Sequence, residues 1–365
     1  MVLDLIVVFK LYTLRSALHI YVHYRSVSLM VTDPYLTTPF LHEAMWFYVI
    51  TSFIVLWFTW RWLRNRQKVG NYRHRYVVIT GCDSGFGNLL AKRLDVLGFH
   101  VFAGCFSQQG IDMLNKETSD NVKAIQLDVS KTESINKALA NVKASLTENT
   151  GIWGLVNNAG IVGSPVPVEW LSREDYQETL AVNTFGMIEM CRVFLPLLLK
   201  ANGRIINMSS IAGRIAIATA PYTISKYAVE GYSDVLRREL YRRGVTVHII
   251  EPGHFRTSMS DPDTICNAVT NKFNSLSTHM QIYYGKEYVE KVKKVIRTGI
   301  DYIGSPRVNL VYEAYIHALT AKHPQQRYLV GYDAKLLFRI LWNLPEWMSD
   351  YVLCQGRPIP AAEKT

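Results

Sequence analysis

Residues 76–87 read YVVITGCDSGFG, and this stretch decides the fold. The apolar run Tyr76–Thr80 predicts a buried strand, and the segment NLLAKRLDVLG that begins at Asn88 predicts a helix. Glycines between a strand and a helix allow a tight turn, and they let the backbone approach a pyrophosphate at the positive end of the helix. The residues expected to bind a dinucleotide here are Thr80, Gly81, Asp83, Ser84, Gly85, Phe86 and Gly87.

The same alternation of short apolar runs with helical patterns continues to about residue 257. The strands expected after the first one are HVFAG, AIQLDV, WGLVNNAG, RIINMSS and TVHIIEPG. Strands that alternate with helices pair in parallel, because each crossover returns the chain to the same end of the sheet. Residues 76–257 are therefore expected to form an α/β catalytic domain with a Rossmann-type, doubly wound parallel sheet.

Three polar residues further along the chain predict catalysis. Tyr222 and Lys226 are four residues apart in PYTISKYAVEGYSDVLRREL, which predicts a helix with both side chains on one face. A phenol with an ordinary pKa near 10 needs a nearby cation to act as a base at neutral pH, and Lys226 with a positively charged nicotinamide would supply that field. No other tyrosine in the sequence has a lysine four residues further on. Tyr222 is the expected proton carrier, and Ser210 is expected to hydrogen-bond the substrate oxygen.

Six elements in this order resemble the signature of the short-chain dehydrogenase/reductase family: the glycine turn, Asn157–Gly160, Asn183, Ser210, the Tyr222–Lys226 pair and Pro252–Gly253. The resemblance implies that Asn183 is a fourth catalytic residue, which bends a helix and fixes a water joined to the lysine. It also implies further contacts with the cofactor. The residues concerned are Asp128, Val129, Asn158, Ala159, Gly160, Tyr222, Lys226, Pro252, Gly253 and Thr257.

Ser209 and Ser210 both follow the expected strand RIINM, and the usual family spacing to Tyr222 would favour Ser209. A closer similarity favours Ser210. The segments TGCDSGFGN, SSIAGR, YTISKYAVEGYSDVLRREL and IEPGHFRT resemble the retinol and hydroxysteroid dehydrogenases, a branch in which the second serine of the pair is active. The resemblance implies oxidation of a lipophilic alcohol, with retinol to retinal as the expected reaction and a 3α- or 17β-hydroxysteroid as the alternative substrate. A catalytically idle, membrane-tethered dinucleotide-binding scaffold is a distant alternative.

The choice of cofactor depends on the residues near the 2′ position of the adenosine ribose. Gly104 and Cys105, at the end of the second expected strand, offer neither an acid nor a base. Ser84 stands where a basic residue would pair with the phosphate of NADP, and Asp83 beside it would repel that phosphate at short range. NAD is the expected cofactor, with NADP as the alternative.

The N-terminal region differs in texture from the rest of the chain. Ala44–Trp60 reads AMWFYVITSFIVLWFTW, an uncharged run, and residues 44–63 are long and apolar enough to be a transmembrane helix. A buried core helix is the alternative. Residues 64–75 form a basic linker with five lysines and arginines and no acid, so the positive-inside rule predicts that the catalytic domain faces the cytosol, at the endoplasmic reticulum membrane. The extension 1–43 is expected to be either an interfacial amphipathic helix or a disordered lead-in.

Residues 258–365 leave the strand–helix pattern, and they are expected to cover the substrate and to associate with the membrane. Within them, Ala334–Met348 is apolar and aromatic but too interrupted by charges to span a bilayer. Such a segment suits the membrane interface, with a helix packed on the sheet as the alternative.

Composition restricts the partners. The formal net charge is +10, but the basic residues are scattered, so no nucleic-acid partner is expected. The five cysteines lack CxxC or Cys/His ligand spacing, so neither a metal site nor a disulfide framework is expected. The expected partners are a lipophilic alcohol (a retinoid or a steroid), membrane lipid and a second copy in a homodimer, formed through the helices near Asn183–Leu199 and Tyr222–Tyr241.

Overall fold

The computed structural model describes residues 34–363, with side chains described from residue 45 onward. The chain divides into two compact units, Met1–Arg66 and Gln67–Thr365, each considered separately. Helix α2 (Pro34–Arg66) forms the described part of the first unit, and it extends beyond both ends of the predicted span 44–63. The rest of the predicted extension, residues 1–33, lies outside the described residues.

Most large side chains of α2 that the structure describes are exposed. The stretch Met45–Arg66 has a mean hydropathy of 1.2, and none of its apolar window is buried in the protein. Trp46, Phe47 and Phe53 are 59%, 65% and 70% exposed. An apolar helix that the protein does not cover requires another apolar environment, so α2 is a candidate membrane span. Among the described residues, Arg173–Ala201 is also long and apolar enough, but half of its apolar window is buried.

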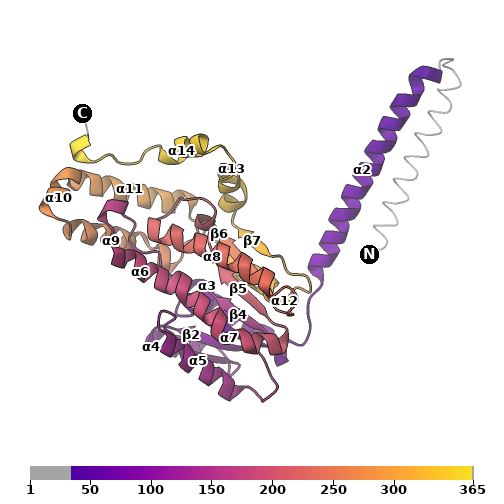
Figure 1. Cartoon of the computed structure of the whole chain (residues 1–365), viewed down its shortest axis with the longest axis horizontal. Coiled ribbons are helices and arrows are strands. Elements are labelled where there is room, and N and C mark those ends of the chain that lie inside the picture. Colours follow the sequence, from indigo (N-terminus) through magenta and orange to yellow (C-terminus); the bar gives the residue numbers. More distant parts are fainter. Residues whose placement is uncertain (1–33, 364–365) are drawn as a thin grey trace. The chain divides into compact units, whose positions relative to one another are not determined.

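The second unit is built around a parallel sheet of seven strands in the order β3-β2-β1-β4-β5-β6-β7. Figure 1 labels β2, β4, β5, β6 and β7 of this sheet. The strand bounds are β1 Tyr76–Thr80, β2 His100–Cys105, β3 Val122–Gln126, β4 Gly154–Asn157, β5 Arg204–Met208, β6 Thr246–Pro252 and β7 Arg327–Val330. The order reverses between β1 and β4, and in such sheets ligands bind outside the carboxyl ends of the strands at this reversal. The predicted doubly wound α/β fold is confirmed.

Helices cover both faces of the sheet, which explains why most residues of the central strands are apolar. Asn157 and Asn207, which are polar and buried in neighbouring strands, hydrogen-bond to each other. Helices α3 (Gly85–Leu97), α4 (Gln108–Glu117) and α12 (Asn309–Thr320) share one core with alternate strand residues, and Val77 and Ile79 belong to it. The opposite core contains Val78 and Phe102 together with residues of the other helices. Those helices are α5 (Thr132–Ser145), α7 (Met187–Ala201) and α8 (Ala220–Glu239).

The chain beyond residue 257 contributes to the central sheet. Strand β7 pairs with β6, and α12 packs on α3 and the sheet, so the predicted boundary after Thr257 does not separate the catalytic sheet from the C-terminal region. A strand of four residues, RYLV, is too short for its periodicity to be recognised. Between η5 (Ser258–Ser260) and α12, the helices α9 (Pro262–Asn274), α10 (Thr278–Tyr284) and α11 (Lys286–Ile303) form a smaller cluster with Trp170.

The predicted interfacial segment folds into η6 (Asp333–Phe338), α13 (Arg339–Leu341) and α14 (Glu346–Cys354). One side of it is buried, because Phe338 and Leu341 pack on Ile211 and Ile215, which follow Ser210 in the chain. Trp342, Leu344 and Leu353 are partly buried against the same residues, and the other large apolar side chains of the segment are exposed. They are Tyr332, Leu336, Leu337, Ile340, Trp347, Met348, Tyr351 and Val352. Both features, packing on the core and an uncovered apolar face, therefore occur in one segment.

Candidate active site

Backbone contacts close the glycine turn after β1. Gly81 and Gly85 have φ values of +71° and +62°, which L-residues with a side chain rarely adopt. A Cβ at Gly87 would lie 2.6 Å from Nδ2 of Asn158 and closer still to the carbonyl oxygen of Gly81. Helix α3 begins at Gly85, so its free N–H groups and the positive end of its dipole face the turn. These residues fit the pyrophosphate of a dinucleotide, which needs close approach to backbone.

Thr80 and Asn158 fasten the turn to the end of β4. The Thr80 hydroxyl accepts hydrogen bonds from the backbone N–H groups of Asn158 and Ala159, both at 3.0 Å. Nδ2 of Asn158 donates to the carbonyl oxygens of Thr80 and Gly81, also at 3.0 Å. The hydroxyl of Tyr315, on α12, donates to Oδ1 of Asn158 at 3.1 Å. Thr80 is fully buried, so it supports the turn from below, and the part of Tyr315 was not foreseen in the sequence.

The Asp83 carboxylate, which belongs to the glycine turn, lies at the end of β2. The last residues of that strand, Gly104 and Cys105, carry no acid themselves. The Asp83 oxygens accept hydrogen bonds from the N–H groups of Phe106 and Ser107, at 2.7 and 2.8 Å, and from the Ser107 hydroxyl at 2.7 Å. A carboxylate offers about four acceptor positions, so one remains for a ribose hydroxyl. The Ser84 hydroxyl lies 2.8 Å from that of Ser258, which joins the turn to the loop after β6.

Asp128 lies at the same end of the cavity, next to Val129. Burial would raise the pKa of Asp128, but hydrogen bonds from Ser130 and the nearby Lys131 outweigh it and hold the pKa below its ordinary value. The Ser130 N–H and hydroxyl are 3.0 and 2.6 Å from Oδ1. Asp128 is therefore a carboxylate at neutral pH and can accept a hydrogen bond from an amino group.

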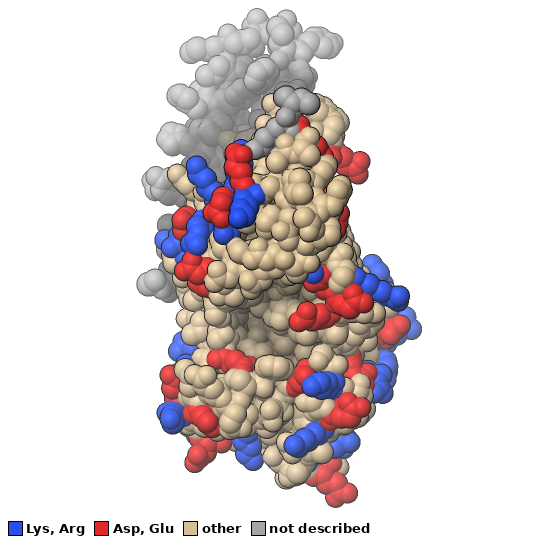
Figure 2. All heavy atoms as spheres, turned by 90° about the vertical axis from the view of Figure 1, so that its left-hand side faces the viewer, with Lys and Arg blue, Asp and Glu red and all other residues tan. Residues whose placement is uncertain are grey.

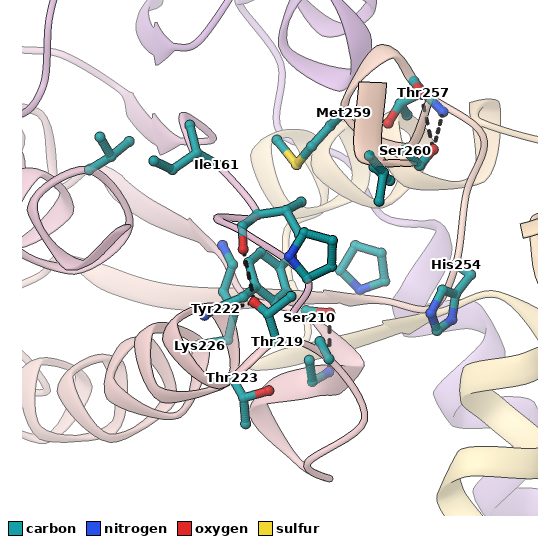
Figure 3. Close-up of a pocket in the computed structure, with 18 of the residues that line it drawn as sticks. Ile161, Ser210, Thr219, Tyr222, Thr223, Lys226, His254, Thr257, Met259 and Ser260 are labelled. Atoms are coloured by element: carbon teal, nitrogen blue, oxygen red, sulfur yellow. Dashed lines mark hydrogen bonds between the residues drawn. The ribbon is translucent and has the colours of Figure 1, made fainter. Parts of the chain in front are cut away.

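Ser210, Tyr222 and Lys226 come together in one cavity, as Figure 3 shows. Ser210 precedes η4 (Ile211–Gly213), and its hydroxyl accepts from the N–H of Ala212 at 3.1 Å. Tyr222 and Lys226 lie one turn apart on α8, with the Lys226 nitrogen 5.4 Å from the centre of the tyrosine ring. That nitrogen also donates to the carbonyl oxygen of Met208 at 2.9 Å. The arrangement places a hydroxyl, a phenol and an ammonium group around one point.

Burial shapes the acid–base behaviour of this group. It raises the pKa of Tyr222, while a hydrogen bond with the Ser210 hydroxyl opposes the rise. It also lowers the pKa of Lys226 to about 8, against the attraction of Glu230. Ser209 is almost completely buried and its hydroxyl lies 3.5 Å from the carbonyl oxygen of Lys226, facing α8. Of the two serines, Ser210 has the geometry to meet a substrate beside Tyr222.

Asn183 lies in η3 (Ala181–Gly186), a π-helical turn between α6 (Arg173–Leu180) and α7. Its Oδ1 accepts a hydrogen bond from the N–H of Ile161, and its Nδ2 donates to the carbonyl oxygen of Ile161, both at 2.8 Å. Nδ2 also donates to the Ser225 hydroxyl at 3.0 Å. A Cβ at Gly160 would lie 3.2 Å from Oδ1 of Asn183 and 3.7 Å from Nζ of Lys226. Asn183 is buried behind the cavity wall, and the bare α-carbon of Gly160 separates it from Lys226.

The loop after β6 closes the other side of the cavity. Pro252, Gly253 and Thr257 line it, as does His254, which the sequence analysis did not select. The N–H of His254 donates to the Asp333 carboxylate at 2.7 Å, and the imidazole packs on Phe338 with ring centres 5.7 Å apart. The η6 segment therefore holds this loop in place.

The cavity has a volume of about 1560 Å³. A typical pocket for one small ligand is roughly 300–1,000 Å³, so this one can hold a cofactor together with a substrate. Figure 2 shows a hollow with largely uncharged walls on one face of the molecule. The apolar side chains that line the cavity include Val162, Val166, Met259, Ile265, Val292, Ile296, Ile300 and Ile303. Val292, Ile296 and Ile300 are spaced four residues apart on α11. This spacing predicts one apolar face of a helix, and it could have been recognised in the sequence.

Most residues predicted for the site line this one cavity. Those that line it are Gly81, Asp83, Ser84, Gly85, Phe86, Asp128, Val129, Asn158, Ala159, Gly160, Ser210, Tyr222, Lys226, Pro252, Gly253 and Thr257. Thr80, Gly87 and Asn183 lie directly behind its wall, where they shape the turn and the loop at Ile161.

A glycine cradle at the reversal of a parallel sheet, beside a tyrosine and a lysine on one helix, defines a nicotinamide-dependent dehydrogenase. Residues 75–265 match the family model described as short chain dehydrogenase, and the chain belongs to this family. The resemblance found in the sequence is confirmed.

Relatives specify the branch. The chain is 44% identical to 17-beta-hydroxysteroid dehydrogenase type 6 of Bos taurus over 317 residues, which cover 87% of this chain and 99% of the relative. It is 43% identical to retinol dehydrogenase 7 of Mus musculus with the same coverage. A short-chain dehydrogenase/reductase from Burkholderia phymatum, solved in complex with NAD, shares the fold with a TM-score of 0.58 at 22% identity, covering 80% of this chain and 99% of that one. The protein is an NAD(P)-dependent alcohol dehydrogenase related to the retinol and hydroxysteroid dehydrogenases.

Proposed function

We propose that this protein oxidises a lipophilic alcohol, with Tyr222 as the base, Lys226 and Ser210 as its partners, and Asn183 as a support. The observation that carries the proposal is the convergence of Ser210, Tyr222 and Lys226 in a cavity that also contains the glycine turn. The hydride that leaves the alcohol carbon is taken up by the oxidised nicotinamide, which is the chemistry that the cofactor supplies.

The proton of the alcohol goes to Tyr222. Because burial raises the pKa of this phenol, its ionised form needs positive charge nearby, and the Lys226 ammonium supplies it from the next helical turn. Ser210 donates a hydrogen bond to the substrate oxygen and holds it against the phenol. Asn183 fixes the backbone at Ile161, directly after Gly160, which lies near Lys226; this supports a role in passing the proton onward to water.

We propose NAD as the preferred cofactor. Asp83 supports this choice, because its carboxylate is fastened beside Phe106 and Ser107 at the end of β2. There it can accept a hydrogen bond from a 2′-hydroxyl, and it would repel a 2′-phosphate.

The proposed substrate is a retinoid alcohol, oxidised to the aldehyde. The apolar side chains of α11 and of the loop around Val166 support a bulky, lipophilic molecule. A 3α- or 17β-hydroxysteroid is the second candidate, favoured by the name of the relative that is 44% identical.

We propose that the protein is held at the endoplasmic reticulum membrane with its catalytic unit in the cytosol. The uncovered apolar surface of α2 and the exposed face of η6, α13 and α14 support contact with lipid. Exposed apolar residues on η3 and α8, among them Phe185, Ile224 and Val235, support a homodimer through these helices.

Replacement of one hydroxyl group tests the catalytic proposal. In membranes that carry the full chain, Tyr222→Phe is expected to lower kcat/KM for alcohol oxidation by about 10²–10⁴, because general base catalysis is lost while the ring remains. Tyr227→Phe is the matched control, since Tyr227 lies on the same helix and is 46% exposed. Equal rates for Tyr222→Phe and the unaltered protein would refute the proposal.

The same membranes identify the substrate and the cofactor. All-trans-retinol, a cis-retinol and a panel of 3- and 17-hydroxysteroids are compared under NAD and NADP by kcat/KM. The retinoid proposal requires the highest value with a retinol and NAD, and a higher value with a steroid replaces it by the second candidate.

A further inference from the structure

A cluster of charged side chains lies beneath the loop that carries Ser210. Arg327, on β7, binds three carboxylates: it contacts Glu230 directly, Glu251 at 2.6 Å and Asp234 at 2.9 Å. Arg214, which follows η4, lies 3.1 Å from Glu251 and 3.8 Å from Glu230. The cluster thus joins four elements of the fold: α8, β6, β7 and the catalytic loop.

Glu230 has a special position in this cluster because it lies against the catalytic loop. A Cβ at Gly213 would be 3.0 Å from Cγ of Glu230 and 2.7 Å from the Ser209 hydroxyl, so no space separates the loop from this side chain. The Ser209 hydroxyl is close enough to lower the pKa of Glu230. Arg214 holds the other end of the loop to the same cluster. The residues on both sides of Ser210 are therefore braced by one carboxylate.

Glu230 also belongs to the surroundings of Lys226, one helical turn away on the same side of α8. Three cations, Lys226, Arg214 and Arg327, face three carboxylates in this region. Glu230 favours the ammonium form of Lys226 against the effect of burial. Burial and the neighbouring Glu251 raise the pKa of Glu230, whereas Ser209 and Arg327 lower it. One oxygen of Glu230 is buried without a hydrogen-bond partner among the described residues.

We propose that Glu230 is a positioning residue for alcohol oxidation: its carboxylate holds the Ser210 loop against α8 and keeps Lys226 in its ammonium form. This inference rests on the roles proposed above for Ser210, Tyr222 and Lys226. Glu230 itself does not line the cavity, so it acts through these neighbours.

Glu230→Gln tests the inference through the pH dependence of the enzyme. Without the carboxylate, Lys226 loses its proton at lower pH, and the alkaline limb of kcat/KM should move down by about one pH unit. At pH values above this limb, kcat/KM of the variant should be about tenfold lower than that of the unaltered enzyme. NADH binding, followed by fluorescence, should weaken with the same displaced pH dependence, because Lys226 is among the residues expected to contact the cofactor.

Two further variants make the outcome decisive. Glu239→Gln, an exposed position near the end of the same helix, should keep both pH profiles unchanged. Glu230→Asp keeps the charge but is one methylene shorter, so the alkaline limb should stay in place while kcat falls. Unchanged profiles in a folded Glu230→Gln protein overturn the inference, and so does an unaltered kcat in Glu230→Asp if Glu230→Gln does not fold. If the unaltered protein oxidises no alcohol, the proposed function fails, and NADH binding still decides the role of Glu230.

Discussion

The glycine turn offers the sharpest test of how the fold builds the site, through the substitution Gly87→Ala. The added methyl group would lie 2.6 Å from Nδ2 of Asn158, whereas ordinary contact begins at 3.4 Å, so a shift of at least about 0.8 Å is needed. Gly81 cannot yield easily, because its own α-carbon faces the backbone of Ala159. Asn158 is held by four hydrogen bonds, two of them to the carbonyl oxygens of the turn.

Two effects follow from this crowding. Overpacking of a closed site costs about 1–3 kcal/mol of stability. Displacement of the turn also moves the N–H groups at the start of α3, and the loss of one hydrogen bond to a charged phosphate is worth about 1.5–3 kcal/mol. The Kd for NADH is therefore expected to rise by about 10- to 100-fold.

The measurement is a fluorescence titration of the full chain with NADH, together with thermal unfolding. Gly231→Ala is the matched control, since a Cβ at this position of α8 meets nothing within 4 Å. It should leave the affinity unchanged and stabilise the helix by up to about 1 kcal/mol. If Gly87→Ala binds NADH as tightly as the unaltered protein and unfolds at the same temperature, the closed turn does not determine cofactor binding.

Asp83 and His248 give two further predictions. Asp83→Ser should lower the preference for NAD over NADP by about tenfold or more, because the charge that repels a 2′-phosphate is removed; Asp112→Asn serves as the control, and an unchanged ratio of initial rates would contradict the assignment. Burial lowers the pKa of His248 to about 4, from 6.5 in the unfolded chain, so its contribution to stability is present above pH 6.5 and is lost as the pH falls toward 4. This loss amounts to about 3 kcal/mol of the free energy of unfolding. In urea unfolding, His248→Gln should therefore show a smaller loss of stability between pH 6.5 and 4. If the variant loses stability as steeply as the unaltered protein, groups other than His248 cause the loss.

Strong local periodicity made the first six strands predictable. Runs such as YVVIT and the isoleucines of RIINM are buried on both faces, so these strands are mostly apolar and end at turn residues. Strand β7 is only four residues long, and its place in the sheet depends on pairing with β6, which no local pattern encodes. The predicted span 44–63 covers the apolar centre of α2 and not its full length, because hydropathy marks the apolar run and not the ends of the helical hydrogen bonding.

The glycine turn and the Tyr222–Lys226 pair could be recognised in the sequence, because residue type and spacing along the chain are enough to identify them. The predicted site was incomplete where distant segments meet. The bond of Asp83 to the end of β2 spans 23 residues, and that of Tyr315 to Asn158 spans 157. Contacts of this kind depend on the completed sheet, so the charge cluster around Glu230 could not be inferred from spacing along the chain.

The π-turn at Asn183 makes the length of one helical run critical. Residues 173–201 form a continuous helix in which η3 holds one residue more than α-helical geometry requires. Deleting a single residue within η3 would restore regular winding with little change in the register of α7, but it would remove the wide turn that places Asn183 against the backbone of Ile161. Deleting one residue at the start of α7 would instead rotate the rest of that helix by roughly 100°, since each residue advances an α-helix by that angle, and Met190, Phe194 and Leu197 would turn away from the core. Insertions and deletions in this run are therefore expected to be far less tolerable than substitutions, because the extra residue of η3 sets the position of Asn183 and the residue count of α7 sets the register of the core.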